Sequence, residues 1–276
     1  MKNVKIWKYS GILYILLFFS LSAFAQKTTV IPSSFVGGNA SVAYKNDWLP
    51  FHNPSALAGA EKIGFQLLYE NRYITKELAN KALNIWFPTK YLNIGASFSH
   101  FGYAEYNEML AAVIFARQFG KKLRLGIEID YYTVFLSQSE HYKGTITAQI
   151  GAQISITDDF SIAFNIFNPT FSKVKSELVE NRLPVVFSIG SLYSIKNTVD
   201  WLVQFDKEVS SPLRWATGFE YAPVKEFIIR IGAYGYENFV PTFGAGIKFG
   251  GFKFDVNADY NSILGFSMIG CLGYKF

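Results

Sequence analysis

A two-residue alternation of apolar and polar side chains runs with little interruption from about Glu61 to Phe276. Between residues 123 and 135, the odd positions carry mostly Leu, Ile, Tyr and Phe, whereas the even positions include Arg124, Glu128 and Asp130. Successive side chains of a β-strand point to opposite faces, so this pattern predicts strands with one apolar and one polar face. Residues 252–260 repeat it with sharper contrast. The chain is therefore expected to be all-β.

Turn signals divide the alternation into fourteen candidate strands, with twelve as the other count that the pattern allows. The strand at 82–88 is short, and in 107–119 apolar residues compete for both faces. The fourteen candidates are residues 61–70, 82–88, 92–102, 107–119, 123–137, 144–156, 160–167, 185–194, 198–207, 213–222, 227–236, 241–249, 252–260 and 264–276.

The links between these strands alternate in length. Those after even-numbered strands are tight, such as residues 120–122 and 250–251, whereas most of those after odd-numbered strands are longer, such as residues 71–81 and 168–184. Short turns at one end and longer loops at the other are typical of bacterial outer-membrane barrels. We therefore predict a closed antiparallel up-and-down transmembrane barrel of about fourteen strands, with lipid outside and a polar lumen.

Composition supports a membrane protein over a soluble one. The chain has 27 Phe, 17 Tyr and 5 Trp, and only 17% of its residues are charged, against about 25% in soluble globular domains. The alternative is a secreted β-sandwich, whose strands also alternate. A sandwich does not need nearly every strand to be long enough to span a bilayer, nor short turns confined to one edge. The barrel is the better interpretation.

Residues 1–25 have the features of a secretory signal peptide. Lys2, Lys5 and Lys8 precede an apolar run, and Ala23-Phe24-Ala25 forms a small-x-small cleavage site. Removing these three lysines leaves 23 basic against 21 acidic residues, so the basic charge belongs mostly to the leader and nucleic acid is not an expected partner. The chain divides into a signal peptide at 1–25, an N-terminal segment at 26–60 and a barrel at 61–276.

Charged side chains on the polar face are expected to line the lumen. Their signs nearly balance, and buried charges are tolerated when they pair with one another. Two interpretations remain open: a salt-bridge lattice that fills and stiffens the barrel, or a polar permeation path. The predicted lattice consists of Arg124, Glu128, Asp130, Arg214, Glu220, Arg230, Lys253 and Asp255.

An enzyme is not expected. Of the three histidines, His52, His100 and His141, the last follows Glu140 in a loop that also holds Ser137 and Ser139, where a catalytic dyad could stand. Serine, glutamate and histidine in a polar loop are common by chance. Metal-ligand histidine spacing, a calcium loop and a phosphate-binding glycine loop are missing from the sequence, so no cofactor is expected.

Several short motifs carry a family resemblance. The alternating run that ends on Phe276 resembles the signature read by the barrel-assembly machinery of Gram-negative outer membranes. Gly37-Gly38-Asn39-Ala40, followed by residues 51–59 (FHNPSALAG), resembles the hatch of FadL-like barrels. Residues 101–108 (FGYAEYNE) and 166–169 (IFNP) resemble the PorV/PorQ branch of that superfamily, known from Bacteroidetes. The resemblance implies fourteen strands, an N-terminal hatch and the outer membrane, with outer-membrane lipid and the assembly machinery as partners.

The hatch interpretation rests on Asn53, Pro54 and Leu57, since Asn-Pro restricts the backbone and the following apolar residues form a compact group. Because an even strand count puts both chain ends on the turn side, we expect residues 26–60 on that side, with the apolar group entering the barrel mouth as a plug that either seals the lumen or gates it. Two functions follow from the resemblance. One is passage of small hydrophobic ligands. The other is a non-catalytic component of a secretion or surface-attachment system, as in type IX secretion, that binds secreted proteins.

Overall fold

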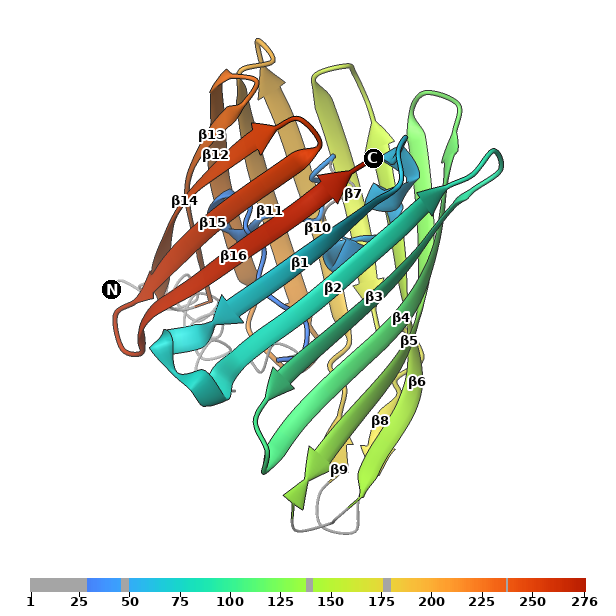
Figure 1. The fold of residues 1–276 in the computed structure, drawn as a ribbon, viewed down its shortest axis with the longest axis vertical. Helices are drawn as coiled ribbons and strands as arrows, with labels where there is room; N and C mark the ends of the chain where they lie inside the picture. Colours follow the sequence, from blue (N-terminus) through green and yellow to red (C-terminus); the bar gives the residue numbers. More distant parts are fainter. Residues whose placement is uncertain (1–28, 46–49, 138–140, 176–179, 237) are drawn as a thin grey trace, which may run out of the picture.

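The barrel closes completely in the computed structural model, which describes residues 29–45, 50–137, 141–175, 180–236 and 238–276 (Figure 1). Fourteen tilted antiparallel strands form one closed sheet in the order β1-β16-β15-β14-β13-β12-β11-β10-β7-β6-β5-β4-β3-β2. Their bounds are β1 Gly64–Asn71, β2 Ala79–Pro88, β3 Asn93–Gly102, β4 Tyr106–Phe119, β5 Leu123–Leu136, β6 Tyr142–Ser155, β7 Phe160–Phe167, β10 Val186–Ile195, β11 Val199–Glu208, β12 Arg214–Val224, β13 Phe227–Gly235, β14 Phe239–Phe249, β15 Phe252–Asn261 and β16 Gly265–Lys275.

The fold and the count of fourteen barrel strands are as the alternation predicts. Each barrel strand pairs with its neighbours in sequence, except that β7 pairs with β10 and β1 closes the barrel on β16. The two weak candidates are full strands, because β2 extends to ten residues and β4 to fourteen. The predicted signal peptide, residues 1–25, lies outside the described residues.

The two ends of the barrel differ. The links after β2, β4, β6, β10, β12 and β14 are tight, and we call this end of the barrel the turn end. The C-terminus also lies there (Figure 1). The opposite, long-loop end carries two 3-10 turns between β1 and β2, η4 (Arg72–Ile74) and η5 (Lys76–Leu78). Between β7 and β10 it carries a separate two-stranded sheet, β8 (Lys173–Lys175) with β9 (Glu180–Arg182).

The outside of the barrel is apolar and the inside is polar. Along β5, Ile127 and Ile129 are 44% and 50% exposed, whereas Glu128 between them is 1% exposed. The large exposed side chains of the other strands are also mainly Phe, Leu, Ile, Val and Tyr. Such a surface is stable in hydrocarbon and unstable in water, which indicates a barrel embedded in a membrane. No helix among the described residues is long and apolar enough to cross a membrane.

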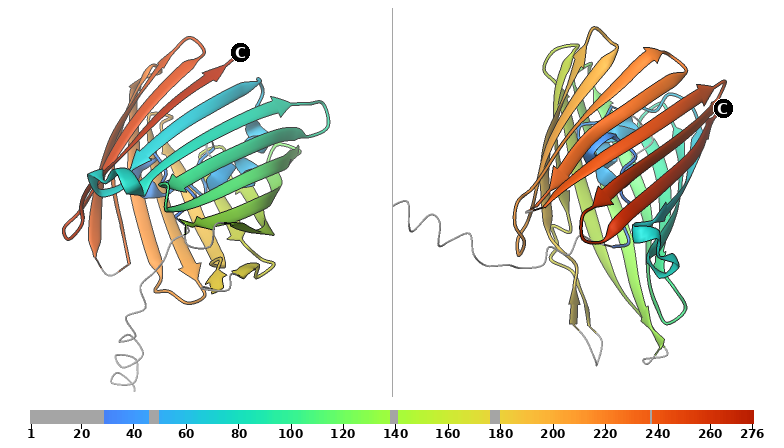
Figure 2. Two further views of the ribbon diagram at one scale, coloured as in Figure 1. Left: turned by 60° about the horizontal axis from the view of Figure 1, so that its bottom comes forward. Right: turned by 90° about the vertical axis from the view of Figure 1, so that its left-hand side faces the viewer.

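The chain before β1 runs through the inside of the barrel (Figure 2). We call its described part, residues 29–45 and 50–60, the inner segment. It contains three 3-10 turns, η1 (Gly37–Asn39), η2 (Pro50–His52) and η3 (Pro54–Gly59). Most of its apolar side chains are buried, and Val30, Phe35 and Leu57 have no exposed surface. Together with inward-facing wall residues they form the core of the molecule.

The inner segment spans the lumen from one end to the other. Thr29 donates to Glu108 near the start of β4, at the long-loop end, whereas Leu57 and Ala60 accept from Asn93 at the start of β3, at the turn end. The expectation that the whole segment lies on the turn side was therefore wrong. The strand count places both ends of the barrel wall, but it does not restrict a segment that can enter the lumen.

Candidate functional site

The turn η3 is fixed by the Asn-Pro pair. Asn53 caps it: its side-chain oxygen accepts from the backbone N–H of Ser55 at 3.0 Å and from the Ser55 hydroxyl at 2.6 Å. Pro54 occupies the first position of the turn, where a missing N–H costs nothing. The Asn53 amide also donates to the carbonyl of Val42 at 2.8 Å, which ties two parts of the inner segment together. Leu57 lies beside Gly95 of the wall.

Glycines on the inner face of the wall let the inner segment approach the strands. A Cβ added to Gly151 would lie 1.9 Å from the Asn53 side-chain oxygen, and one added to Gly126 would lie 2.4 Å from the backbone of Pro54. Gly218 and Gly232 make room for η1 in the same way. The sequence interpretation missed this role, although glycine at the polar positions of a strand was a visible signal.

Polar side chains of the wall bind the backbone of the inner segment along its length. The Gln204 side-chain oxygen accepts from Val42 N–H at 2.9 Å, and the Thr242 hydroxyl accepts from Gly38 N–H at 2.8 Å. Gln153 donates to the Ala43 carbonyl at 2.8 Å. Backbone groups of an irregular segment must find partners when they are buried, and here the barrel wall supplies them.

Seven of the eight predicted lattice residues point inward and are at most 5% exposed; Arg124 is half-buried. Four of them form one chain of charges across β12, β13 and β15. Arg230 binds Glu220 at 2.8 Å and Asp255 at 2.8 Å, and Lys253 binds Asp255 at 2.9 Å. Each carboxylate therefore has a cation, as a buried pair requires.

Two aromatic residues of the inner segment complete this chain of charges. The Phe35 ring lies 4.4 Å from the Lys253 ammonium and 5.5 Å from the Arg230 guanidinium carbon, within cation–π range. The Tyr44 hydroxyl donates to Glu220 at 2.7 Å. The charges thus hold the inner segment as well as one another.

The remaining lattice residues lie elsewhere in the lumen. Arg214 forms an ion pair with Asp206 and donates to the carbonyl of Asn39 at 3.2 Å. Arg124, at the turn end, donates to Gln118 at 3.0 Å and lies against Gly59 of the inner segment. Glu128 and Asp130 are adjacent on the inner face of β5, and neither is ion-paired with a described basic side chain. The structure therefore separates the predicted set into four groups: the four-residue chain of charges, Arg214, Arg124, and the pair Glu128 and Asp130.

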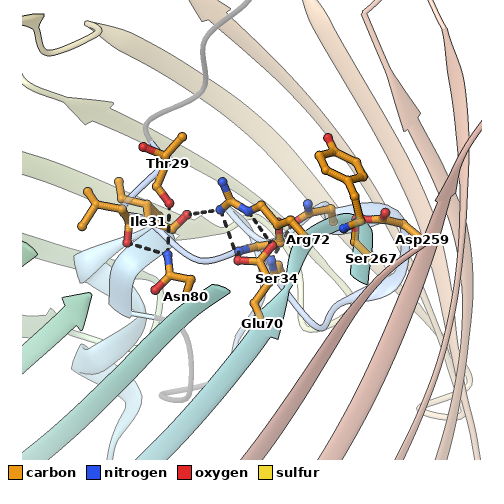
Figure 3. Close-up of polar contacts among 12 residues, drawn as sticks. Thr29, Ile31, Ser34, Glu70, Arg72, Asn80, Asp259 and Ser267 are labelled. Atoms are coloured by element: carbon orange, nitrogen blue, oxygen red, sulfur yellow. Dashed lines mark hydrogen bonds and ion pairs between the residues drawn. The ribbon is translucent and has the colours of Figure 1, made fainter. Parts of the chain in front are cut away.

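A further polar cluster holds the start of the inner segment at the long-loop end (Figure 3). Glu70 pairs with Arg72 at 3.0 Å and accepts from the backbone of Ser33 at 3.1 Å, while Arg72 donates to the Ile31 carbonyl at 3.1 Å. Although burial lowers the pKa of Arg72, the Glu70 charge outweighs it and raises that pKa above its usual value. The guanidinium thus stays charged.

A cavity of about 80 Å³ remains between the inner segment and the wall. Its apolar side includes Ile31, Phe51 and Phe167, and its polar side includes Asp206 and Arg214. The other lining residues are Asn39, His52, Gln149, Asn165, Val186, Ser188, Gln204, Glu208 and Tyr236. Polar side chains therefore make up most of the lining.

The three histidines do not come together. His52 lines the cavity, His100 is on β3 with its side chain outward, and His141 precedes β6. Ser139 and Glu140 lie outside the described residues. Among the described residues, no group of three or more His, Cys, Asp or Glu side chains is placed to hold a metal ion.

Comparison with solved structures identifies the fold. The CymD monoaromatic hydrocarbon channel is similar with a TM-score of 0.67 at 11% identity, over 90% of this chain and 97% of that one. The toluene transporter TodX of Pseudomonas putida has a TM-score of 0.63 at 10% identity, over 87% and 95%. A Pseudomonas aeruginosa FadL homologue has 0.59 at 11%, over 90% and 98%. No family model matches the sequence, and no curated protein is detectably similar to it.

Proposed function

We propose that this protein is an outer-membrane channel of a Gram-negative bacterium that passes small, mainly apolar ligands through its lumen, with the inner segment as a movable hatch. The observation that carries the proposal is the position of the inner segment. It fills a FadL-like barrel from end to end, while a small cavity remains beside it. Residues 1–25 would direct export, and the terminal run ending at Phe276 would address the barrel-assembly machinery.

The cavity marks where a ligand would first bind. Its volume of about 80 Å³ is roughly half that of an engineered apolar cavity of ~150 Å³ that holds benzene, so a monoaromatic ligand would have to displace part of the inner segment. Ser188 of β10 lines this cavity, and Ser191 lies on the opposite face of the same strand. Ser188→Phe should abolish binding of toluene in detergent, measured by calorimetry, and Ser191→Phe should leave binding unchanged.

Passage requires the inner segment to move, and a disulfide can prevent that movement. An ideal Cβ at Gly190 lies 2.4 Å from Cγ1 of Val42, where the sulfur of a cysteine at position 42 would stand, so Val42→Cys with Gly190→Cys places two sulfurs near bonding range. The only native cysteine, Cys271, is replaced by alanine in this variant.

In proteoliposomes, the oxidised variant should take up toluene no faster than protein-free vesicles, and reduction should restore uptake. Equal uptake in both redox states would show that the ligand does not need the hatch to move. The PorV/PorQ interpretation, with secreted proteins as partners, gains no support from the comparisons, and the hydrocarbon channels favour transport.

A further inference from the structure

A groove crosses the outer surface of the barrel where the sheet closes. It has a volume of about 760 Å³ and is lined by residues of β1, β2, β3, β15 and β16, within the roughly 300–1,000 Å³ of small-molecule sites. Leu67, Leu83 and Phe98 stand side by side on adjacent strands and form its apolar wall, with Phe254 and Leu272 continuing the row. All five side chains point away from the lumen.

Gly270 creates the depth of this groove. It occupies an outward position of β16 between Val256 on β15 and Tyr69 on β1. A Cβ added there would meet nothing within 4 Å. A side chain at this position would fill the groove, so its absence leaves an open channel between two apolar flanks.

Polar side chains border the groove on the side of the long-loop end. Tyr69, Lys81 and His100 are direct partners on β1, β2 and β3, so they form one row on the outer surface. Directly paired side chains have Cβ atoms about 5 Å apart, which lets one anionic group contact several of them. Lys81 and His100 each stand two residues from the long-loop end of their strands.

Lys81 has an unusual environment for a lysine on this surface. Within the described part of the chain it makes no ion pair or hydrogen bond, whereas Lys207, on the outer face of β11 at the same end, donates to the Ser211 carbonyl. An unpaired ammonium on the lipid-facing side of a barrel is unfavourable unless it reaches the head-group region or meets an anion. Lys81 borders the groove two residues from the long-loop end of β2, where its side chain can reach the head-group region.

We propose that this groove is a binding site for one anionic membrane lipid of the leaflet at the long-loop end. An acyl chain lies over Gly270 between the apolar side chains, and the phosphate head group contacts Lys81, His100 and the Tyr69 hydroxyl. The lipid would occupy the outer wall, apart from the lumen, so the inference does not depend on the proposed transport.

Native mass spectrometry of the detergent-solubilised protein with equal amounts of phosphatidylglycerol and phosphatidylcholine of the same chain length tests this site. The wild type should retain one phosphatidylglycerol with at least a fivefold preference. Lys81→Gln with His100→Gln should reduce that preference to about onefold, and Gly270→Leu should remove the retained lipid. Lys207→Gln is the matched control and should behave as the wild type. Each variant is first shown to be folded by its heat-dependent mobility.

Three results would overturn the inference. An unchanged preference in the Lys81/His100 double variant would show that these side chains do not contact the head group. Full retention in the Gly270→Leu variant would show that the acyl chain does not lie in the groove. Equal losses with Lys207→Gln would show a general charge effect.

Discussion

Replacing Ile127 with arginine tests which face of the wall meets lipid. Ile127 is 44% exposed and stands between Phe115 and Ile150 on the neighbouring strands, both also directed outward. It comes four residues after β5 begins at Leu123. At about 3.4 Å per residue and a tilt near 40°, this is roughly 10 Å from the turn end, close to the middle of an apolar band about 25 Å tall.

An arginine near the bilayer midplane destabilises a barrel by about 2–4 kcal/mol. We therefore expect Ile127→Arg to reduce the free energy of unfolding by that amount. The matched control is Glu128→Gln, one residue further along the strand and buried in the lumen, where Glu128 accepts from the Ser97 hydroxyl at 3.4 Å and faces no described cation. Glutamine keeps the size of the side chain and can still accept that hydrogen bond, so its effect should stay within about 1 kcal/mol.

Urea titration of both variants in phospholipid vesicles, followed by tryptophan fluorescence, measures the two changes. Each loss of unfolding free energy is measured relative to the wild type, and the two losses are then compared. Equal destabilisation, or a larger effect from Glu128→Gln, would refute the assignment of the inner and outer faces.

Arg230→Met should destabilise the barrel by about 3–5 kcal/mol in the same titration, because two buried carboxylates lose their guanidinium; a loss below 1 kcal/mol would contradict the ion-pair network. Gly151→Ala should displace Asn53 and raise the single-channel conductance, whereas Gly270→Ala should not, since its Cβ meets open space; equal conductance in both would show that η3 tolerates the methyl group. The purified protein should shift its electrophoretic mobility on heating and show β-rich circular dichroism, and recovery in a soluble fraction would argue against a membrane barrel.

The barrel wall could be predicted from the sequence because its two faces meet different solvents. Alternation in β5 and β15 reports directly which side chains face lipid and which face the lumen, so strand number and inward charges follow from the pattern. The strand β4 was ambiguous for a physical reason. Its inner face is also apolar: Leu110 and Ile114 are buried, and Ile114 lies near Leu57 of η3, so the polarity of the strand does not alternate.

The path of the inner segment could not be predicted in the same way. Its backbone is irregular and its partners are distant in sequence, as in the contact of Tyr44 with Glu220 or of Gly38 with Thr242. Periodicity carries no information about such pairs. The cavity also depends on how the segment packs, and the groove at Gly270 depends on closure between β1 and β16. Both are properties of the closed barrel that no single strand reveals.

If the inner segment closes the lumen, deleting residues 26–60 should open it. The wall pairs through β1–β16 without this segment, so the deletion variant should fold and keep its heat-dependent mobility. We predict a conductance in planar bilayers that is several times that of the full-length protein. An unchanged conductance in a demonstrably folded deletion would contradict the claim, because the charged side chains around Arg230 would then close the lumen by themselves.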